Sequence, residues 1–206
     1  MSIFDAIAAG DLERVRELAP AEGAARNEQG VSALMLARYH GRQDAAEAIR
    51  PHAGELDVFE AAATGDVERL RALLTADAGL ARAFSSDGYT ALHYACFFGS
   101  TDAALALVDA GADLEAVATG ENRVAPLQSA AAAGNADAAR VLLDAGADVN
   151  CRGQGSFTPL HSAAQNGDET LARLLLERGA DREARLADGR APRDLAQAGA
   201  LAELLG

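Results

Sequence analysis

The chain is organised as pairs of short apolar stretches with helical spacing, and a glycine separates the two members of each pair. In the clearest example, Thr158-Pro159-Leu160-His161 precedes two alanines, and Gly167 follows them. A threonine hydroxyl can cap a helix, and proline suits the first helical position, where no amide hydrogen is needed. Glycine readily adopts the positive φ that commonly ends a helix. This stretch therefore predicts a helix that begins at Pro159 and ends at Gly167.

A second helix is predicted behind each of these glycines. After Gly167, the residues Leu171, Leu174 and Leu175 have the spacing of one helical face, and Gly179 ends the pattern. The residue directly after the glycine can cap this second helix in five of the six units, with Arg42 as the exception. The five capping residues are Asp11, Asp66, Ser100, Asn135 and Asp168.

The glycine between the two helices recurs with a period. It lies at positions 10, 41, 65, 99, 134 and 167, so the successive gaps are 31, 24, 34, 35 and 33 residues. A Gly-Ala-Asp turn follows the last three of these glycines, at Gly111, Gly146 and Gly179. A single unit of two helices cannot bury its own apolar face, whereas a row of such units can. The period therefore predicts a solenoid of stacked helix pairs.

These segments resemble the ankyrin repeat family, whose signature is Thr-Pro-Leu-His-x-Ala with a period of about 33 residues. The match is strong at residues 158–181 and 90–113, and good at residues 125–150, where Gln128 replaces the histidine. The resemblance implies an all-α, ankyrin-type solenoid of about six to seven helix-turn-helix repeats with short hairpin fingers. We expect one domain over residues 1–206 that ends in a truncated capping repeat at residues 185–206.

The 24-residue gap breaks this period. After a helix that ends near Arg50, the segment Pro51-His52-Ala53-Gly54 leads at once into the next helix, which leaves no room for a finger. The pattern from Ile3 to Arg14 also recurs from Val58 to Arg69. We therefore predict that residues 1–54 form an added two-repeat lobe, joined in an altered way to the central repeats at residues 55–184.

Charge and composition narrow the choice of partners. The net charge is -13, which disfavours nucleic acid and anionic membranes as partners and favours association with a basic protein. The first 20 residues lack the basic start and apolar core of a secretory signal, and no apolar run approaches the ~20 residues that span a bilayer. We expect a cytoplasmic protein. All 18 basic residues are Arg, which together with the abundant Ala suggests a GC-rich, bacterial-like genome.

Catalytic and metal-binding patterns are missing from the sequence. The two cysteines, Cys96 and Cys151, lack CxxC spacing, and we expect Cys96 to be packed and Cys151 to be the more exposed. No His-x-x-x-His pair and no Gly-x-Ser-x-Gly elbow occurs. The ankyrin resemblance implies that His93 and His161 are structural residues that form hydrogen bonds near the repeat turn. We therefore expect a protein that is not an enzyme and that has no metal or cofactor.

The resemblance also indicates where a partner would bind. In ankyrin repeats, contacts usually come from the hairpin tips and from the two residues before the first-helix glycine, which face the concave groove. The small pair Ala132-Ala133 would leave a dip beside Phe97 and Phe98 that could accept a partner side chain. The alternative that Phe97 and Phe98 only fill space stays open for at least one of them. The candidate partner-binding residues are Tyr39, His40, Tyr89, Phe97, Phe98, Glu121, Asn122, Phe157, Gln165 and Asn166.

Three hypotheses for the function follow. The first is a monomeric, non-enzymatic scaffold that binds a protein partner, of unknown identity and favoured to be basic, through its concave groove and hairpin tips. The second is a solenoid that associates with itself through its alanine-rich end faces. The third, a small enzyme that uses His and Asp, has no motif in its support.

Overall fold

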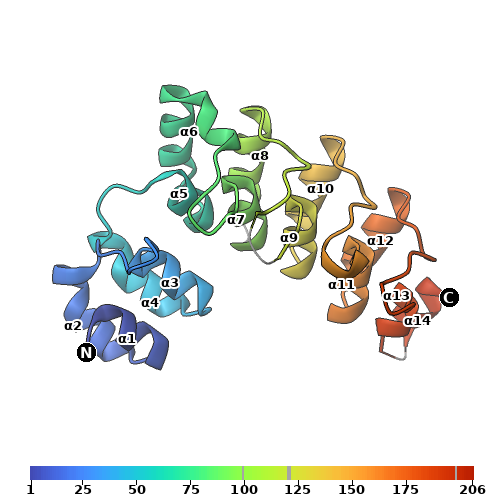
Figure 1. Ribbon diagram of the computed structural model, residues 1–206, viewed down its shortest axis with the longest axis horizontal. Helices are drawn as coiled ribbons and strands as arrows, with labels where there is room; N and C mark the ends of the chain where they lie inside the picture. The colour runs from blue at the N-terminus through green and yellow to red at the C-terminus, as the bar shows by residue number, and fades with distance from the viewer. Residues whose placement is uncertain (99, 120–121, 198) are drawn as a thin grey trace.

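Helix pairs stacked side by side make up this protein in a computed structural model that describes residues 1–98, 100–119, 122–197 and 199–206 (Figure 1). Each pair has a first helix on the inner side of the row and a second helix on its outer side. The pairs are α1 (Ile3–Ala9) and α2 (Leu12–Glu22), α3 (Ala33–Tyr39) and α4 (Gln43–Ile49), α5 (Val58–Thr64) and α6 (Val67–Ala76), α7 (Ala91–Phe98) and α8 (Thr101–Asp109), α9 (Pro126–Ala132) and α10 (Ala136–Asp144), α11 (Pro159–Asn166) and α12 (Glu169–Glu177), and α13 (Pro192–Leu195) and α14 (Ala200–Leu205). Three short 3-10 turns, η1 (Arg50–His52), η2 (Ala78–Arg82) and η3 (Gln154–Ser156), complete the elements of the described residues. The predicted all-α solenoid is confirmed.

The core lies between successive inner helices. From α5 onward, each inner helix packs closely on the next, and the outer helices form a second, looser row behind them. Alanine makes this close approach possible: Ala130, Ala131, Ala163 and Ala164 are all fully buried. One leucine from each of α7, α9 and α11 fills the remaining space, namely Leu92, Leu127 and Leu160.

Local capping sets the ends of the helices as the sequence predicts. The Thr158 hydroxyl accepts a hydrogen bond from the His161 amide, with Pro159 at the first helical position, and Gly167 ends α11 with a φ of 70°. Each of the five predicted residues caps its second helix, for example Asp168, whose carboxylate accepts from the Leu171 amide at 2.9 Å. Arg42 makes no such bond at the start of α4.

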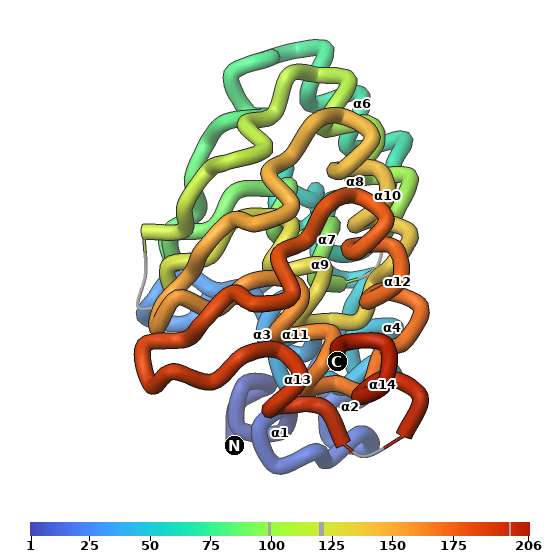
Figure 2. Tube along the Cα trace, turned by 90° about the vertical axis from the view of Figure 1, so that its right-hand side faces the viewer, coloured from blue at the N-terminus to red at the C-terminus, as the bar shows by residue number. Residues whose placement is uncertain are grey.

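Tight hairpin turns, the fingers, connect most pairs and project on one side of the stack (Figure 2). Each is closed by a backbone hydrogen bond of 2.9 Å across the turn. Neighbouring fingers also pair, since the Thr119 amide donates to the Gly88 carbonyl and the Ala187 amide to the Gly155 carbonyl. The closing bonds run from Asn27 to Val31, Ser85 to Tyr89, Ala118 to Val124, Gly153 to Phe157 and Leu186 to Arg190.

A side chain in the first turn of α7, α9 and α11 ties each repeat to the next finger. His93 Nε2 lies 2.9 Å from the Val124 carbonyl, and His161 Nε2 lies 3.4 Å from the Arg190 carbonyl. Gln128 does the same, because its amide donates to the Phe157 carbonyl at 2.7 Å while its oxygen accepts from the Ala125 amide. The structural role expected for the two histidines is confirmed, and glutamine performs it equally.

The first two helix pairs lie off the row formed by the others (Figure 1). The helix α3 packs only lightly on α5, whereas α5 packs closely on α7. The missing finger is confirmed, since η1 directly follows α4 and the chain then enters α5 at Val58. The N-terminal lobe (residues 1–54) as a separate unit stays a prediction. None of the described helices has the length and apolar character needed to cross a membrane.

Candidate partner-binding groove

Six of the nine aromatic side chains gather where α3 and α5 meet α7. Their ring centroids lie 5.2 to 6.4 Å apart between neighbours, within the range over which aromatic rings attract each other. The ring of Phe98 stacks on that of Tyr94, while Phe97 meets Phe98 edge to face. The six residues of this aromatic cluster are Tyr39, Phe59, Tyr89, Tyr94, Phe97 and Phe98.

A polar network holds the cluster together from one side. The Asp87 carboxylate accepts hydrogen bonds from the hydroxyls of Tyr39, Tyr94 and Ser85, the last two at 2.5 Å. Burial, reinforced by the Asp87 carboxylate, raises the pKa of Tyr39 and of Tyr94, so both remain donors. Burial alone would raise the pKa of Asp87, but the three hydroxyl donors outweigh it and hold that pKa below its ordinary value.

The position of Asp87 is unusual for a finger tip. Aspartate in an Asp-Gly turn is mostly exposed, but Asp87 is half-buried and its carboxylate faces the tyrosines. Sequence spacing gives no sign of this arrangement, because Tyr39 lies 48 residues before Asp87 and reaches it across the missing finger.

The aromatic cluster opens into a hollow of about 340 Å³, here called the aromatic pocket. Phe97 is 49% exposed and Tyr39 is 41% exposed, although both are large and apolar. The predicted dip beside Phe97 and Phe98 is present, with Ala132 on its far side. The lining residues are Tyr39, Tyr89, His93, Tyr94, Phe97, Phe98, Asn122, Val124, Gln128, Ser129 and Ala132.

A second hollow of about 410 Å³, here called the amide hollow, continues from the aromatic pocket toward the C-terminus. The two hollows share Asn122, Val124, Gln128 and Ala132, so together they form one groove along α7, α9 and α11. Within the described part of the chain, the side-chain amides of Gln154 and Gln165 make no hydrogen bond. The remaining residues of the amide hollow are Gly153, Gln154, Phe157, Ser162, Gln165 and Asn166.

The described lining of this groove carries no charged side chain. Among the described lining residues, His93 is the one that could carry a positive charge. Burial lowers its pKa below the ordinary value, so its imidazole is neutral at pH 7. The charged side chains of the described residues therefore lie outside this lining. A neutral groove with apolar and amide groups can take an uncharged segment of protein chain without stranding a charge away from water.

The structure brings eight of the ten candidate residues to the groove. His40 is exposed at the end of α3 and lines neither hollow. Glu121 lies outside the described residues. The residues at the groove are Tyr39, Tyr89, Phe97, Phe98 and Asn122 in the aromatic pocket, and Phe157, Gln165 and Asn166, with Asn122 again, in the amide hollow.

Burial answers the question of whether Phe97 and Phe98 only fill space. Phe98 is partly buried and stacked on Tyr94, so the space-filling alternative accounts for it, but it does not account for the exposed Phe97.

Sequence reasoning missed Gln128 and Ser129 as groove residues. Their signal was present, because both follow the Pro126-Leu127 helix start at the positions that His161 and Ser162 hold after Pro159-Leu160.

Both thiols and two of the four histidines, His93 and His161, are buried in the packing. Cys96 is fully buried as expected, and Cys151 is the more exposed of the two at 8%, although it too is buried. Burial raises the pKa of Cys151 to about 12. Both ring nitrogens of His93 and of His161 have hydrogen-bond partners. Among the described residues, no group of three or more His, Cys, Asp or Glu is placed to hold a metal ion.

The comparison with protein families agrees with the geometry. A family model described as "Ankyrin repeats (3 copies)" matches residues 58–118 and 117–185, which together span more than half of the 206 residues. Ankyrin repeats generally serve as protein–protein interaction modules. The matched region begins at the first residue of α5 and contains the fingers and inner helices that form the groove. On the period, the fold and this match, the chain belongs to the ankyrin repeat family.

Proposed function

We propose that this protein is a non-enzymatic scaffold that binds a protein partner along the groove formed by the aromatic pocket and the amide hollow. The observation that carries the proposal is the exposure of Phe97 and Tyr39 at the mouth of a 340 Å³ apolar hollow. Exposed aromatic side chains around a pocket are unfavourable in water unless a partner covers them, and buried aromatic anchors dominate binding energy in protein interfaces.

The groove supports an extended segment of the partner as the bound element. The amide hollow presents Gln154 and Gln165, whose donors and acceptors suit a peptide backbone, and the aromatic pocket suits one anchoring side chain. A standard interface of about 1,200 to 2,000 Å² would extend beyond the groove to the finger tips. The net charge of -13 would speed the encounter with a partner that is basic outside the bound segment.

The proposal is tested by capturing partners from cells of the source organism with the wild-type protein and with two variants. Phe97→Ala removes the exposed ring in the pocket, while Leu105→Ala removes a similarly exposed apolar side chain on the outer helix α8, at 43% exposure. We expect Phe97→Ala to weaken the affinity of the captured partner at least ~10-fold, the cost of a modest hot spot, and Leu105→Ala to leave it unchanged.

Two outcomes would contradict the proposal. A partner that binds Phe97→Ala as tightly as the wild type does not use the pocket. Light scattering that shows a concentration-dependent dimer whose formation persists in Phe97→Ala would favour self-association through the end faces instead.

A further inference from the structure

We propose that the aromatic pocket is a two-part socket, in which the N-terminal lobe supplies one wall and docks against α5 and α7 to hold a neutral apolar side chain of the partner. The inference rests on the proposed function, because it names the chemistry of the anchor that the groove accepts. It adds that occupation of the pocket and docking of residues 1–54 are coupled.

The lobe contributes to the pocket through the last turn of α3. Tyr39 is the one lining residue of the aromatic pocket that comes from residues 1–54 of the described chain. Its hydroxyl donates to Asp87 and lies 2.9 Å from the Tyr94 hydroxyl, and its ring centroid lies 5.9 Å from that of Phe98. Beside it, Arg38 donates to the Phe98 carbonyl at 2.9 Å and places its guanidinium 4.8 Å from the centre of the Phe98 ring. The wall is therefore in place only when α3 lies against α7.

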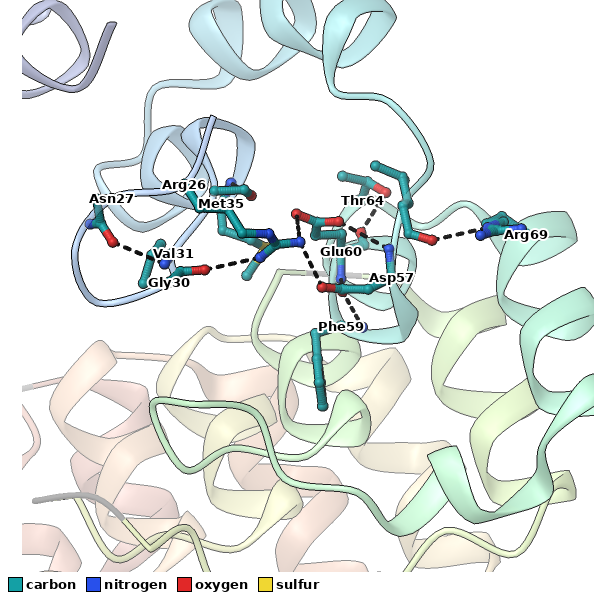
Figure 3. A network of polar contacts seen from close by, with 12 residues as sticks. Arg26, Asn27, Gly30, Val31, Met35, Asp57, Phe59, Glu60, Thr64 and Arg69 are labelled. Atoms are coloured by element: carbon teal, nitrogen blue, oxygen red, sulfur yellow. Dashed lines mark hydrogen bonds and ion pairs between the residues drawn. The ribbon is translucent and has the colours of Figure 1, made fainter. Parts of the chain in front are cut away.

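Ion pairs reinforce the joint that holds the lobe in this position, beside the aromatic contacts of Tyr39. Arg26 at the base of the first finger reaches Asp57 at 3.0 Å and the buried Glu60 at 3.1 Å, at the start of α5 (Figure 3). On the outer side, Arg50 pairs with Asp66, the cap of α6. The helices α3 and α5 pack lightly on each other by comparison with α5 and α7.

The ties that join the central repeats do not cross this joint. In α7, α9 and α11 the linking position holds His93, Gln128 or His161, each of which donates to the next finger. In α3 the same position holds Met35, and in α5 it holds Glu60, which accepts from Arg26 instead. No finger lies between α4 and α5 in the described chain to receive such a bond.

Charge therefore helps to hold the wall in place. Two of the ion pairs at the joint, Arg26–Asp57 and Arg50–Asp66, are partly exposed on both sides, whereas Glu60 is buried. Exposed ion pairs are individually weak and screened by salt. A ligand that contacts Tyr39 and α7 together binds only the docked arrangement, so it shifts the population toward docking. Because the apparent affinity scales with the fraction of molecules that is docked, anything that lowers this fraction weakens ligand binding in the same proportion.

The occupant follows from the lining. The described lining residues are uncharged at neutral pH, and the carboxylate behind them, Asp87, is already bound by three hydroxyl donors. A charged side chain in the pocket would therefore lose water without gaining a free counter-charge. An aromatic or large aliphatic side chain gains contacts with the aromatic rings instead. We therefore use N-acetyl-L-phenylalaninamide as the probe and N-acetyl-L-argininamide as its charged counterpart.

The experiment measures probe affinity by saturation-transfer NMR on the full chain. Salt is raised from about 0.1 M to about 1 M NaCl, which shortens the Debye length from about 10 Å to about 3 Å. The two-part socket predicts that the affinity for the phenylalanine probe falls several-fold, although the pocket itself is uncharged. Binding to a preformed apolar pocket would be unchanged or strengthened by the same salt. The arginine probe is expected to bind at least several-fold more weakly at low salt.

Variants separate the joint from the pocket. Arg26→Gln combined with Arg50→Gln removes the joint ion pairs, and we expect several-fold weaker probe binding with little remaining salt dependence. Arg178→Gln is the matched control, because Arg178 forms a comparable pair with Asp144 at 2.7 Å between two central repeats. Phe97→Ala is expected to abolish binding. If the double variant does not fold, the salt series on the wild type still decides the outcome.

Docking itself has a spectroscopic readout. The chain has no Trp, and its three tyrosines, Tyr39, Tyr89 and Tyr94, all belong to the aromatic cluster. Tyrosine emission therefore reports on the joint, because a hydrogen bond to a carboxylate quenches it. We expect salt to increase the emission and the phenylalanine probe to reverse that increase.

The possible failures are distinguishable. Probe binding that is lost in Phe97→Ala but is independent of salt and of Arg26 and Arg50 overturns the two-part socket and leaves the proposed groove function intact. Equal binding of both probes overturns the neutral anchor. No binding of the phenylalanine probe by the wild type overturns the whole inference, while the partner capture with Phe97→Ala decides the proposed function separately.

Discussion

At the scale of the residue, the linking position in the first turn of each inner helix determines how one repeat is tied to the next. His93 and His161 accept at Nδ1 from the cap residue's amide, and their Nε2 faces a finger carbonyl. Gln128 makes the same pair of contacts with its amide group. The tie between a repeat and the next finger needs one acceptor and one donor on a single side chain, so a neutral histidine and a glutamine are equivalent.

This equivalence predicts a specific dependence of stability on pH. Burial lowers the pKa of His93 and of His161 below the ordinary value of 6.5. The unfolded chain therefore binds protons near pH 6.5 that the folded chain does not. The stability from these residues is complete above pH 6.5 and is lost as the pH falls toward their folded pKa values.

A variant with His93→Gln and His161→Gln should keep the ties between repeats, because Gln128 makes the same contacts in the wild type, and it should lose this sensitivity to acid. We expect its thermal midpoint, followed by circular dichroism, to match that of the wild type at pH 7.5 within a few degrees. Between pH 7.5 and pH 5 the midpoint should fall less in the variant. An equal fall in both proteins would show that the histidines do not carry the effect.

At the scale of the element, the finger that contains residues 84–90 is tied to two helices by one carboxylate. Asp87 binds Tyr39 at the end of α3 and Tyr94 within α7. An ordinary finger needs no such contact: Asp188, in the corresponding Asp-Gly tip of a later finger, is exposed and bonds only to Arg190 among the described residues.

The two aspartates form a matched pair for mutation. Asp87→Asn weakens three hydrogen bonds to a charged acceptor, so we expect a loss of ~1–2 kcal/mol in the free energy of unfolding. Asp188→Asn should leave the urea midpoint unchanged. Since the pKa of Asp87 is lowered in the folded protein, the difference in unfolding free energy between the wild type and Asp87→Asn should be present above pH 3.8 and disappear as the pH falls through the folded pKa. Equal urea midpoints for the wild type and Asp87→Asn at pH 7 would contradict the proposed role of Asp87 in tying the finger to α3 and α7.

The same elements show what a sequence can and cannot predict. The helix pairs, their caps and the missing finger follow from local chemistry, because capping residues and glycines act within one turn. The dip at Ala132 follows from the repeat register. The meeting of Tyr39 with Asp87 and Tyr94 does not follow, because the period breaks between them and the angle of the joint depends on packing between distant segments. Sequence reasoning therefore found most of the groove but not the network behind it.

At the scale of the whole molecule, the chain combines a regular stack with a differently attached end. The stack from α5 to α14 is continuous in its packing, whereas α1–α4 are attached through arginines and tyrosines. The groove runs along the regular part, where a rigid surface lowers the entropy cost of binding. Its aromatic end lies at the joint, where the attached end completes it.

The location of the partner is the central claim, and hydroxyl-radical footprinting of the complex with a captured partner tests it most directly. The exposed side chains Phe97 and Tyr39 lie in the groove, whereas Leu105 and Met1 are exposed elsewhere. We predict that the partner protects Phe97 and Tyr39 from oxidation and leaves Leu105 and Met1 as reactive as in the free protein. Protection of Leu105 on the outer helices, with Phe97 still fully reactive, would contradict the account.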